Sequence, residues 1–311
     1  MLKVTISCII PTLGRGRILC DTIEMLLTQS YPAHEIIVVD QTAEPDAETR
    51  GALENWHQQK KIRWLHQTEP NASKARNVGA LAATGDVVLF LDDDIRVKTD
   101  FLATYAETFE RTGALAVSGQ VLEGDGATVD ELPPKAFDPE FGWLYFRKNY
   151  SKECETTFMI SCNAAIRRDI FLNLGGMDEN YERGAWREET DFSMRFIREG
   201  FKFRYNPKCS IYHLGAKMVR GGGARSWWQE SPFWYFHHCV GDWYFNIRFV
   251  SIRLFFPLLK NSLRAFVINR ERLHKPWIIP VCLIFWLSAL PVAIWRRING
   301  AAVIKGSETK S

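Results

Sequence analysis

The stretch Val87-Val-Leu-Phe-Leu91-Asp92-Asp93-Asp94 decides the fold that we expect for this chain. Five consecutive apolar residues predict a strand, and three carboxylates follow it at once. Ligands of open α/β sheets bind beyond the carboxyl ends of the strands. Adjacent carboxylates repel one another unless a cation compensates them, and Mg²⁺ takes such oxygen ligands. The alternative is an acidic turn that caps the next helix.

Short apolar runs alternate with helical patterns on the amino-terminal side of this strand. The pattern predicts strands over residues 4–10, 35–39 and 62–66, and helices over residues 21–30, 47–59 and 73–83. Such alternation predicts an α/β fold with a mostly parallel sheet and helices on both faces. Asp40 follows the second strand, so it is expected at the same edge as Asp92 to Asp94.

Signals are weaker in the second part of the chain. Residues 119–150 are rich in glycine, proline and acids, which predicts a long loop of the kind that often carries function. A helix is expected over residues 188–199, and strands near 203–205 and 210–213.

Length and composition indicate one large domain with an appendage. The chain has 311 residues, 46% of them hydrophobic, and we divide it into a catalytic domain, 1–225, and a carboxy-terminal region, 226–311. The net charge of +3 gives no indication of nucleic-acid binding. No secretory signal is expected at the start, so the catalytic domain is expected in the cytoplasm. The seven cysteines form no CxxC pair and are expected to be reduced thiols: Cys8, Cys20, Cys154, Cys162, Cys209, Cys239 and Cys282.

The carboxy-terminal region is expected to associate with a membrane. Aromatic residues crowd the stretch from Trp227 to Phe245, and residues 277–295 contain no charge. Nineteen apolar residues are long enough for a transmembrane helix, although Pro280 and Pro291 weaken that interpretation. A re-entrant or interfacial segment stays open as an alternative. The flanking basic residues would attract anionic lipids.

Two further motifs start helices. Asn71 or Ser73 caps the first, and this helix start with Arg76 would favour an anionic donor. The alternative is an ordinary capped helix with a surface arginine. Glu188, Glu189 and Asp191 begin the second helix, where acids suit the helix dipole. Their functional interpretation is a general base, because neighbouring carboxylates raise each other's proton affinity.

Two downstream features have both a plain and a functional interpretation. His213 follows a short strand, and a lone histidine is usually structural but can also bind a metal or a phosphate. Lys217, Arg220 and Arg225 flank Gly221-Gly222-Gly223, a loop that could close over a pyrophosphate or serve as a plain linker.

In their order, these motifs resemble the family 2 glycosyltransferases, which have the GT-A fold. The resemblance runs from about residue 4 to residue 215. The matching stretches are Ser7-Cys-Ile-Ile-Pro-Thr12, Glu35-Ile-Ile-Val-Val-Asp40, Ala75-Arg-Asn-Val-Gly79, Gly85-Asp-Val-Val-Leu-Phe-Leu-Asp-Asp-Asp94, Cys162-Asn-Ala-Ala-Ile-Arg-Arg168, Gly175-Gly-Met-Asp-Glu179, Glu188-Glu-Thr-Asp191 and Tyr212-His213.

The resemblance implies a role for each matching residue. For donor binding, Pro11 and Thr12 would line the nucleotide pocket, Asp40 would hold the base, Arg76 would lie near the donor, Asp92 would meet the ribose or sugar with Asp93 beside it, and Asn163 would touch the sugar or acceptor. Asp94 would bind Mg²⁺ or Mn²⁺ directly, with His213 near the metal. Glu189 stands where the family usually has aspartate as the base, so Asp191 could share the work.

The implied activity is transfer of a sugar from a nucleotide-diphosphate sugar, UDP favoured, to a hydroxyl acceptor with inversion. The acceptor is expected to be a saccharide or a lipid-linked molecule at the cytoplasmic face of the cell membrane, with a polysaccharide or glycolipid as product. Two alternatives are a nucleotidyltransferase, suggested by the loop Thr12-Leu-Gly-Arg-Gly-Arg17, and an inactive membrane-bound binding module.

Overall fold

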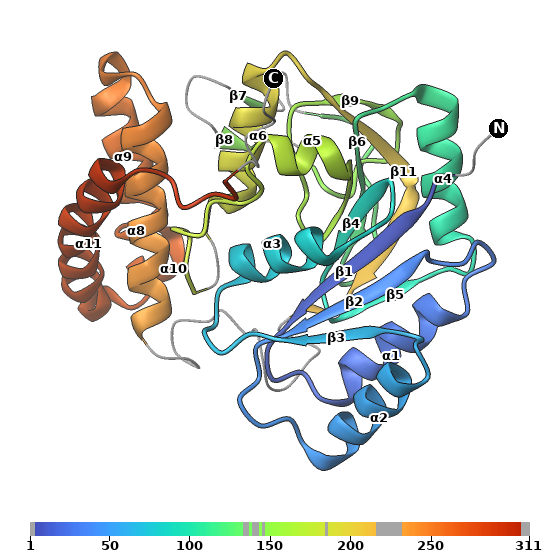
Figure 1. Cartoon of the computed structure of the whole chain (residues 1–311). Helices are drawn as coiled ribbons and strands as arrows, with labels where there is room; N and C mark the ends of the chain where they lie inside the picture. Colours follow the sequence, from blue (N-terminus) through green and yellow to red (C-terminus); the bar gives the residue numbers. More distant parts are fainter. Residues whose placement is uncertain are drawn as a thin grey trace.

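The computed structural model describes residues 4–132, 137–138, 143–144, 147–183, 186–215 and 232–305 (Figure 1). The glycine-rich loop at residues 221–223, with its flanking cations and the start of the aromatic stretch, lies outside these residues. All seven cysteines are free thiols, as expected.

A nine-stranded mixed sheet organises the amino-terminal part of the chain, with eight strands in the order β3-β2-β1-β4-β10-β6-β11-β5 and β9 beside β11. Its strands are β1 (Ile6–Thr12), β2 (Glu35–Asp40), β3 (Arg63–His66), β4 (Val87–Leu91), β5 (Ile95–Val97), β6 (Ala116–Leu122), β9 (Cys154–Thr156), β10 (Asn163–Arg167) and β11 (Phe203–His213). Strands β1 to β4, β6 and β11 share one direction, whereas β5, β9 and β10 oppose it. The predicted mostly parallel sheet is therefore confirmed.

Helices cover both faces of this sheet, as the alternating pattern predicts. The first layer contains α1 (Arg17–Leu27), α2 (Ala47–Gln58) and α4 (Phe101–Thr112), and the second contains α3 (Ala72–Ala82), α5 (Arg168–Asn173) and α6 (Glu188–Arg198). Strand β4 serves both layers, because Leu89 and Leu91 pack on the first and Val88 and Phe90 on the second. This alternation is the period of a strand that is buried on both faces.

Several boundaries differ from those predicted. Helix α1 begins at Arg17, before residue 21, and β6 occupies the start of the predicted loop 119–150. That region also contains two short strands, β7 (Phe137–Asp138) and β8 (Trp143–Leu144), which pair antiparallel. The two strands expected near 203–205 and 210–213 form one strand, β11, whose register shifts between Asn206 and Ser210. Pro207 lies at this shift and cannot donate a ladder hydrogen bond, which explains the break in the pattern.

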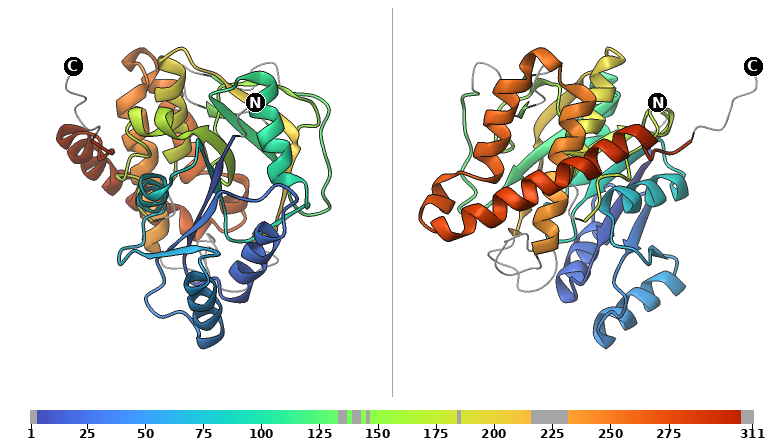
Figure 2. Two further views of the ribbon diagram at one scale, coloured as in Figure 1. Left: turned by 45° about the vertical axis from the view of Figure 1, so that its right-hand side comes forward. Right: turned by 90° about the vertical axis from the view of Figure 1, so that its left-hand side faces the viewer.

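The carboxy-terminal residues form a helical layer beside the α/β unit (Figures 1 and 2). Its elements are α8 (Pro232–Phe249), η1 (Ile252–Leu254), α9 (Phe255–Phe266), α10 (Arg270–Leu273), η2 (Pro276–Ile278) and α11 (Ile279–Asn299). These helices share their own apolar core, to which Tyr181 and Met194 of the α/β unit contribute. Among the described residues, one helical stretch, Pro276–Asn299, is long and apolar enough to cross a membrane, and its most apolar 18-residue window has a mean hydropathy of 2.3.

Candidate active site

The acidic turn after β4 is fixed by the sheet on both sides. Asp92 to Asp94 lead into β5 and not into a helix, so the helix-capping alternative is wrong. The Thr22 hydroxyl of α1 donates to the main-chain carbonyl of Asp93 at 2.9 Å. Strand β5 pairs with β11, with His213 opposite Ile95, and this register brings the imidazole to the turn.

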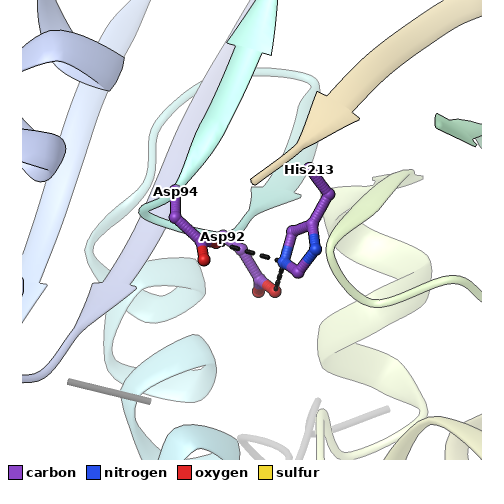
Figure 3. Close-up of side chains that lie close together, drawn as sticks. All are labelled: Asp92, Asp94 and His213. Carbon is purple, nitrogen blue, oxygen red and sulfur yellow. Dashed lines mark ion pairs between the residues drawn. The ribbon is translucent and has the colours of Figure 1, made fainter. Parts of the chain in front are cut away.

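Asp92, Asp94 and His213 converge at this edge (Figure 3). His213 Nε2 lies 3.1 Å from Asp94 Oδ1 and 3.4 Å from Asp92 Oδ2, and the ligand atoms of all three lie within 4.8 Å of one another. Asp94 Oδ1 is buried, and its close partner within the described structure is the His213 imidazole. Two carboxylates suit Mg²⁺ or Mn²⁺, and an imidazole ligand favours Mn²⁺ of the two. A buried carboxylate oxygen that faces the imidazole fits the ligand of such an ion.

His213 carries the electrostatic signature of this cluster. Burial lowers the pKa of His213, but hydrogen bonds to Asp92 and Asp94 outweigh burial and raise the pKa to about 10. Its other nitrogen, Nδ1, lies 3.1 Å from Glu123 Oε1. The carboxylates therefore favour a cation at this position, and a divalent ion could replace the imidazole proton as that cation.

The middle acid of the turn has a different environment. Asp93 accepts from Thr12 Oγ1 at 2.7 Å and from Arg15 Nε at 2.8 Å, while Arg15 also pairs with Asp94 at 3.0 Å. Burial raises the pKa of Asp93 to about 7, although Arg15 and Thr12 oppose this rise. Asp93 thus ties the turn to the β1 loop, and its predicted contact with the donor stays a prediction.

Arg76 joins the acidic turn to the start of α6. Its guanidinium lies 3.7 Å from Asp92 Oδ1 and 3.5 Å from Glu188 Oε1, and the residue is only 4% exposed. The alternative of a surface arginine is therefore wrong. A buried cation between two carboxylates fixes their spacing and can also face a substrate anion.

A cavity of about 490 Å³ opens in front of these groups. Its lining includes Arg76, Asp92, Glu123, Lys148, Phe158, Ile160, Ser161, Cys162, Trp186, Arg187, Glu188, Glu189, Thr190 and His213. A second hollow of about 470 Å³ shares Glu123, Lys148, Phe158, Ile160 and Glu189 with it. Volumes of this size suit a small molecule such as a nucleotide sugar.

The acids at the start of α6 lie on different sides of that helix. Glu189 lines the cavity, and its Oε2 accepts the main-chain N–H of Ser161 at 2.9 Å. Asp191 is fully buried behind it, where it pairs with Arg195 and Arg248 and accepts from Tyr181. Burial raises the pKa of Asp191 against the opposing effect of both arginines. Its surroundings are those of a structural carboxylate, so a share in catalysis has no support from its position.

The other residues that were predicted to bind the sugar donor lie in three kinds of place: at strand ends, at a helix start and in the protein interior. Pro11 and Thr12 end β1 beside Asp40, which accepts from Trp64 Nε1 at 3.2 Å. Of the two caps that the sequence leaves open, Asn71 and not Ser73 caps α3, and the Asn71 amide also donates to the carbonyl of Glu179. Asn163 is fully buried and outside the cavity lining, with its amide bound to the carbonyls of Gln120 and Cys209 and to the Tyr105 hydroxyl. This position gives no support to the expected contact of Asn163 with sugar or acceptor, which stays a prediction.

The sequence pattern did not identify several of the site residues. Arg15 stood out only as part of a loop, yet Gly14 and Gly16 on either side have positive φ and turn its side chain to the acids. Glu123 and Lys148 form an ion pair, with Lys148 Nζ 2.6 Å from Glu123 Oε1. Both come from the region 119–150, which the sequence predicts as a long loop without a role for any single residue. A basic residue between two glycines was the one available signal.

A mostly parallel sheet with an Asp–Asp–His cluster and a carboxylate-lined cavity at its strand ends defines a glycosyltransferase of the GT-A fold. The chain belongs to glycosyl transferase family 2, whose family model matches residues 7–175. This assignment removes the nucleotidyltransferase alternative.

Three known proteins illustrate the relationship. The glucosyl-dolichyl phosphate glucuronosyltransferase of Haloferax volcanii is 30% identical over 250 residues, 75% of each chain. The succinoglycan biosynthesis protein ExoM of Rhizobium meliloti is 30% identical over 199 residues, 62% of each chain. The mannosyltransferase PcManGT of Pyrobaculum calidifontis, solved with GDP-Man and Mn²⁺, is 19% identical with a TM-score of 0.55, over 96% of this chain and 80% of its own. This last likeness shows the fold alone.

Proposed function

We propose that this protein transfers a sugar from a nucleotide-diphosphate sugar to a hydroxyl group of a saccharide or lipid-linked acceptor, with inversion at the anomeric carbon. The observation that carries the proposal is the Asp92–Asp94–His213 cluster at the mouth of a cavity that Glu189 also lines. The cluster and the carboxylate supply the two requirements of the reaction, a place for the leaving diphosphate and a base for the acceptor.

The leaving side of the site is the edge formed by β1, β2 and β4. Thr12 and Asp40 end neighbouring strands, which suits a nucleotide that lies across them. Asp92, Asp94 and His213 would hold a divalent ion, which would neutralise the charge that develops on the nucleoside diphosphate. Arg76 adds a buried positive charge beside Asp92.

The attacking side is assigned to Glu189. A hydroxyl is a poor nucleophile until a base removes its proton, and general-base catalysis contributes about 10²–10⁴-fold. The Ser161 N–H holds one oxygen of Glu189 in place at 2.9 Å, which fixes the direction of the carboxylate. Attack from this side, opposite the diphosphate, inverts the anomeric centre.

Two of the relatives and the carboxy-terminal helices support the proposed acceptor class. One relative is named for a dolichyl phosphate sugar and another for polysaccharide biosynthesis. The apolar stretch Pro276–Asn299 gives this chain its own means of reaching a membrane. We place the enzyme at the cytoplasmic face of the membrane, where nucleotide sugars are made, with a glycolipid or a growing polysaccharide as product.

The test is a binding and hydrolysis screen of UDP-, GDP- and dTDP-sugars with Mn²⁺, Mg²⁺ or EDTA. Asp94→Ala is expected to abolish metal-dependent donor binding, whereas Asp169→Ala, at an exposed acid of α5, serves as the matched control. Glu189→Gln is expected to retain donor binding and lose turnover, with Glu155→Gln as its control at an exposed surface pair. If no donor binds in the presence of either metal, the proposal is wrong. Donor binding without turnover on any acceptor would favour the inactive binding module instead.

A further inference from the structure

The carboxy-terminal helices present an unusually apolar surface. Thirteen of the sixteen large hydrophobic side chains that are exposed among the described residues belong to the segment 252–298. We call this surface the apolar face. Its members are Ile252, Phe255, Phe256, Ile268, Leu273, Trp277, Val281, Leu283, Ile284, Leu287, Ile294, Trp295 and Ile298. Clusters of this kind mark a site that another molecule covers.

The other side of α11 is occupied by protein along its length. Cys282, Trp286, Ala289 and Ala293 recur at helical spacing and are buried in the core of the helical layer. The rings of Trp286 and Trp243 of α8 lie 4.7 Å apart, and the Trp243 indole donates to the Trp286 carbonyl at 2.8 Å. Helix α11 therefore has one side on α8 and the other side exposed, and it lies along the outer side of the molecule (Figure 2, right).

Helix α8 is in turn fixed to the α/β unit by buried charges. Arg248 pairs with Asp178 and Asp191, and Asp242 pairs with Arg187 at 3.2 Å. If α11 crossed a bilayer, α8 and these charges would enter the hydrocarbon beside it, which is strongly unfavourable.

The end of α11 is also held by the α/β unit. Arg296 lies 3.0 Å from Glu182 and donates to the carbonyl of Asn180. Just beyond the helix, the N–H of Glu179 donates to the carbonyl of Ala302, and the N–H of Ile304 donates to Gly175, each at 2.8 Å. These contacts hold α11 against the α/β unit, and they would have to break for α11 to turn into a spanning orientation.

Charge identifies what covers the apolar face. The segment 252–298 contains a single acid, Glu271, whose side chain lies outside the description. Six of its basic residues are exposed: Arg253, Lys260, Arg264, Arg270, Lys275 and Arg297. Exposed cations on the same segment as apolar, tryptophan-containing helix residues match an anionic lipid surface, where apolar side chains enter the acyl region and cations meet the headgroups.

We propose that the apolar face lies in the plane of an anionic bilayer and that α11 does not span it. This inference deepens the membrane association in the proposed function, and it is independent of the donor chemistry. The interpretation of residues 277–295 as a transmembrane helix is thereby set aside in favour of the interfacial alternative.

Flotation of the full chain with vesicles tests this orientation. We expect co-flotation with phosphatidylcholine mixed with phosphatidylglycerol, weaker flotation with phosphatidylcholine alone, and release by alkaline carbonate. The double variant Ile284→Glu and Leu287→Glu is expected to lose at least ~10-fold in vesicle affinity. Leu81→Glu places the same charge at an exposed leucine of α3, outside the apolar face, and is expected to bind normally.

Each other outcome overturns the orientation. Resistance to carbonate means that α11 spans the bilayer, and a concentration-dependent dimer without flotation means that a second copy covers the face. Metal-dependent donor binding, measured on the same variants without vesicles, reports separately on the proposed function, because no residue of the apolar face lines the cavity.

A second, independent observation is a buried hydrogen-bond chain from α11 to the cavity. The indole N–H of Trp286 donates to Ser262 Oγ at 2.8 Å, and the Ser262 hydroxyl donates to Asp242 Oδ2 at 2.7 Å. Asp242 Oδ1 accepts Arg187 Nε at 3.2 Å. Asp242 is fully buried, and Arg187 lines the cavity next to Glu188.

Helix α8, which carries Asp242, also contacts the backbone that precedes α6. A Cβ at Gly241 would lie 2.5 Å from the carbonyl oxygen of Trp186, so glycine is needed for this approach. Arg187 has a left-handed φ of 78°, and its guanidinium lies 4.8 Å from the centre of the Phe245 ring. A left-handed conformation at a non-glycine residue persists only where its surroundings hold it.

We infer that Asp242 is a positioning residue, which holds Arg187 and thereby the Glu188–Glu189 segment against the cavity. Asp242→Asn keeps the shape and removes the charge. It is expected to lower kcat at least ~10-fold while donor affinity stays unchanged, because the displaced group acts on the acceptor side. Ser262→Ala, a milder change two hydrogen bonds away from Arg187, is expected to show the same split with a smaller loss.

Thermal unfolding of both variants separates positioning from stability. A purely structural role for Asp242 would lower the unfolding temperature and leave the kcat of the folded enzyme at the wild-type value. That result, or an equal loss of donor affinity and kcat, would overturn the inference.

Discussion

Arg248 gives the sharpest test of how the helical layer is joined to the α/β unit. Its guanidinium bridges Asp178 and Asp191, whose side chains are fully buried, while the arginine itself is 16% exposed. Arg248→Met keeps most of the aliphatic packing and removes the charge. Removing one partner of a buried ion pair costs about 3–5 kcal/mol, because the carboxylate left behind stays desolvated.

The structure places the expected cost at the lower end of that range. Asp191 keeps Arg195 at 2.8 Å, and Asp178 keeps the Tyr244 hydroxyl at 2.8 Å, so neither carboxylate loses all its partners. We therefore expect a loss of about 3 kcal/mol in the free energy of unfolding. With the denaturant dependence typical of a chain of this size, the urea midpoint falls by about 1 M.

The pH dependence of this loss has a defined sign. Burial raises the pKa of Asp191, and Arg248 partly opposes that rise. Without Arg248 the folded-state pKa rises further, so the folded variant binds a proton at a higher pH than the folded wild type does. The stability deficit of the variant is therefore expected to shrink as pH falls and to grow as pH rises.

Urea unfolding followed by tryptophan fluorescence measures this effect at several pH values. Arg198→Met is the matched control, because Arg198 is exposed and its guanidinium lies 4.8 Å from the Phe249 ring centre without a buried partner charge. We expect a loss below about 1 kcal/mol for this control. Equal midpoints for the two variants would refute the view that buried charges join α8 to the α/β unit.

Three further predictions concern the base, the sheet and the β2 edge. Glu189→Gln is expected to lower turnover at least ~100-fold with unchanged stability. Asp191→Asn is expected to lower the urea midpoint and to leave the turnover of the folded fraction largely intact. The reverse result would make Asp191 the base. Gly119→Ala places a Cβ 2.1 Å from the Cys209 carbonyl oxygen and is expected to lower the free energy of unfolding by about 1–3 kcal/mol, measured by thermal unfolding. Gly51 of α2 has open space around it, so Gly51→Ala is expected to raise the free energy of unfolding by up to about 1 kcal/mol. Burial alone would raise the pKa of Glu35, but hydrogen bonds from Arg63, Thr84 and Ser7 lower it. Glu35→Gln is therefore expected to lower the free energy of unfolding at neutral pH by about 1 kcal/mol, a value already reduced for partial exposure. This difference between variant and wild type is expected to close as pH falls through the lowered folded-state pKa of Glu35.

Local sequence patterns predict much of the sheet but not all of its pairings. The alternation of strands and helices before Asp92 follows from short-range periodicity, which each segment carries by itself. Strand β5 has three residues, too few for a period to show, and β10 enters the sheet antiparallel between β4 and β6. Such insertions depend on contacts between residues far apart in the chain, which no local pattern records.

The sequence by itself determined three local features of the site: acids at the end of β4, a helix cap at Asn71 or Ser73, and acids in the first turn of α6. These assignments are local, because a strand end or a helix start is defined by its own few residues. Tertiary structure alone decided that Glu189 faces the cavity and Asp191 faces Arg248. Residues two positions apart on a helix, as Glu189 and Asp191 are, point in directions ~200° apart, so only the packing of that helix selects which acid meets the substrate. Packing also decided two other positions, that of His213 of β11 beside Asp94 and that of α11 along α8. In both cases the partner element against which the segment packs sets its place.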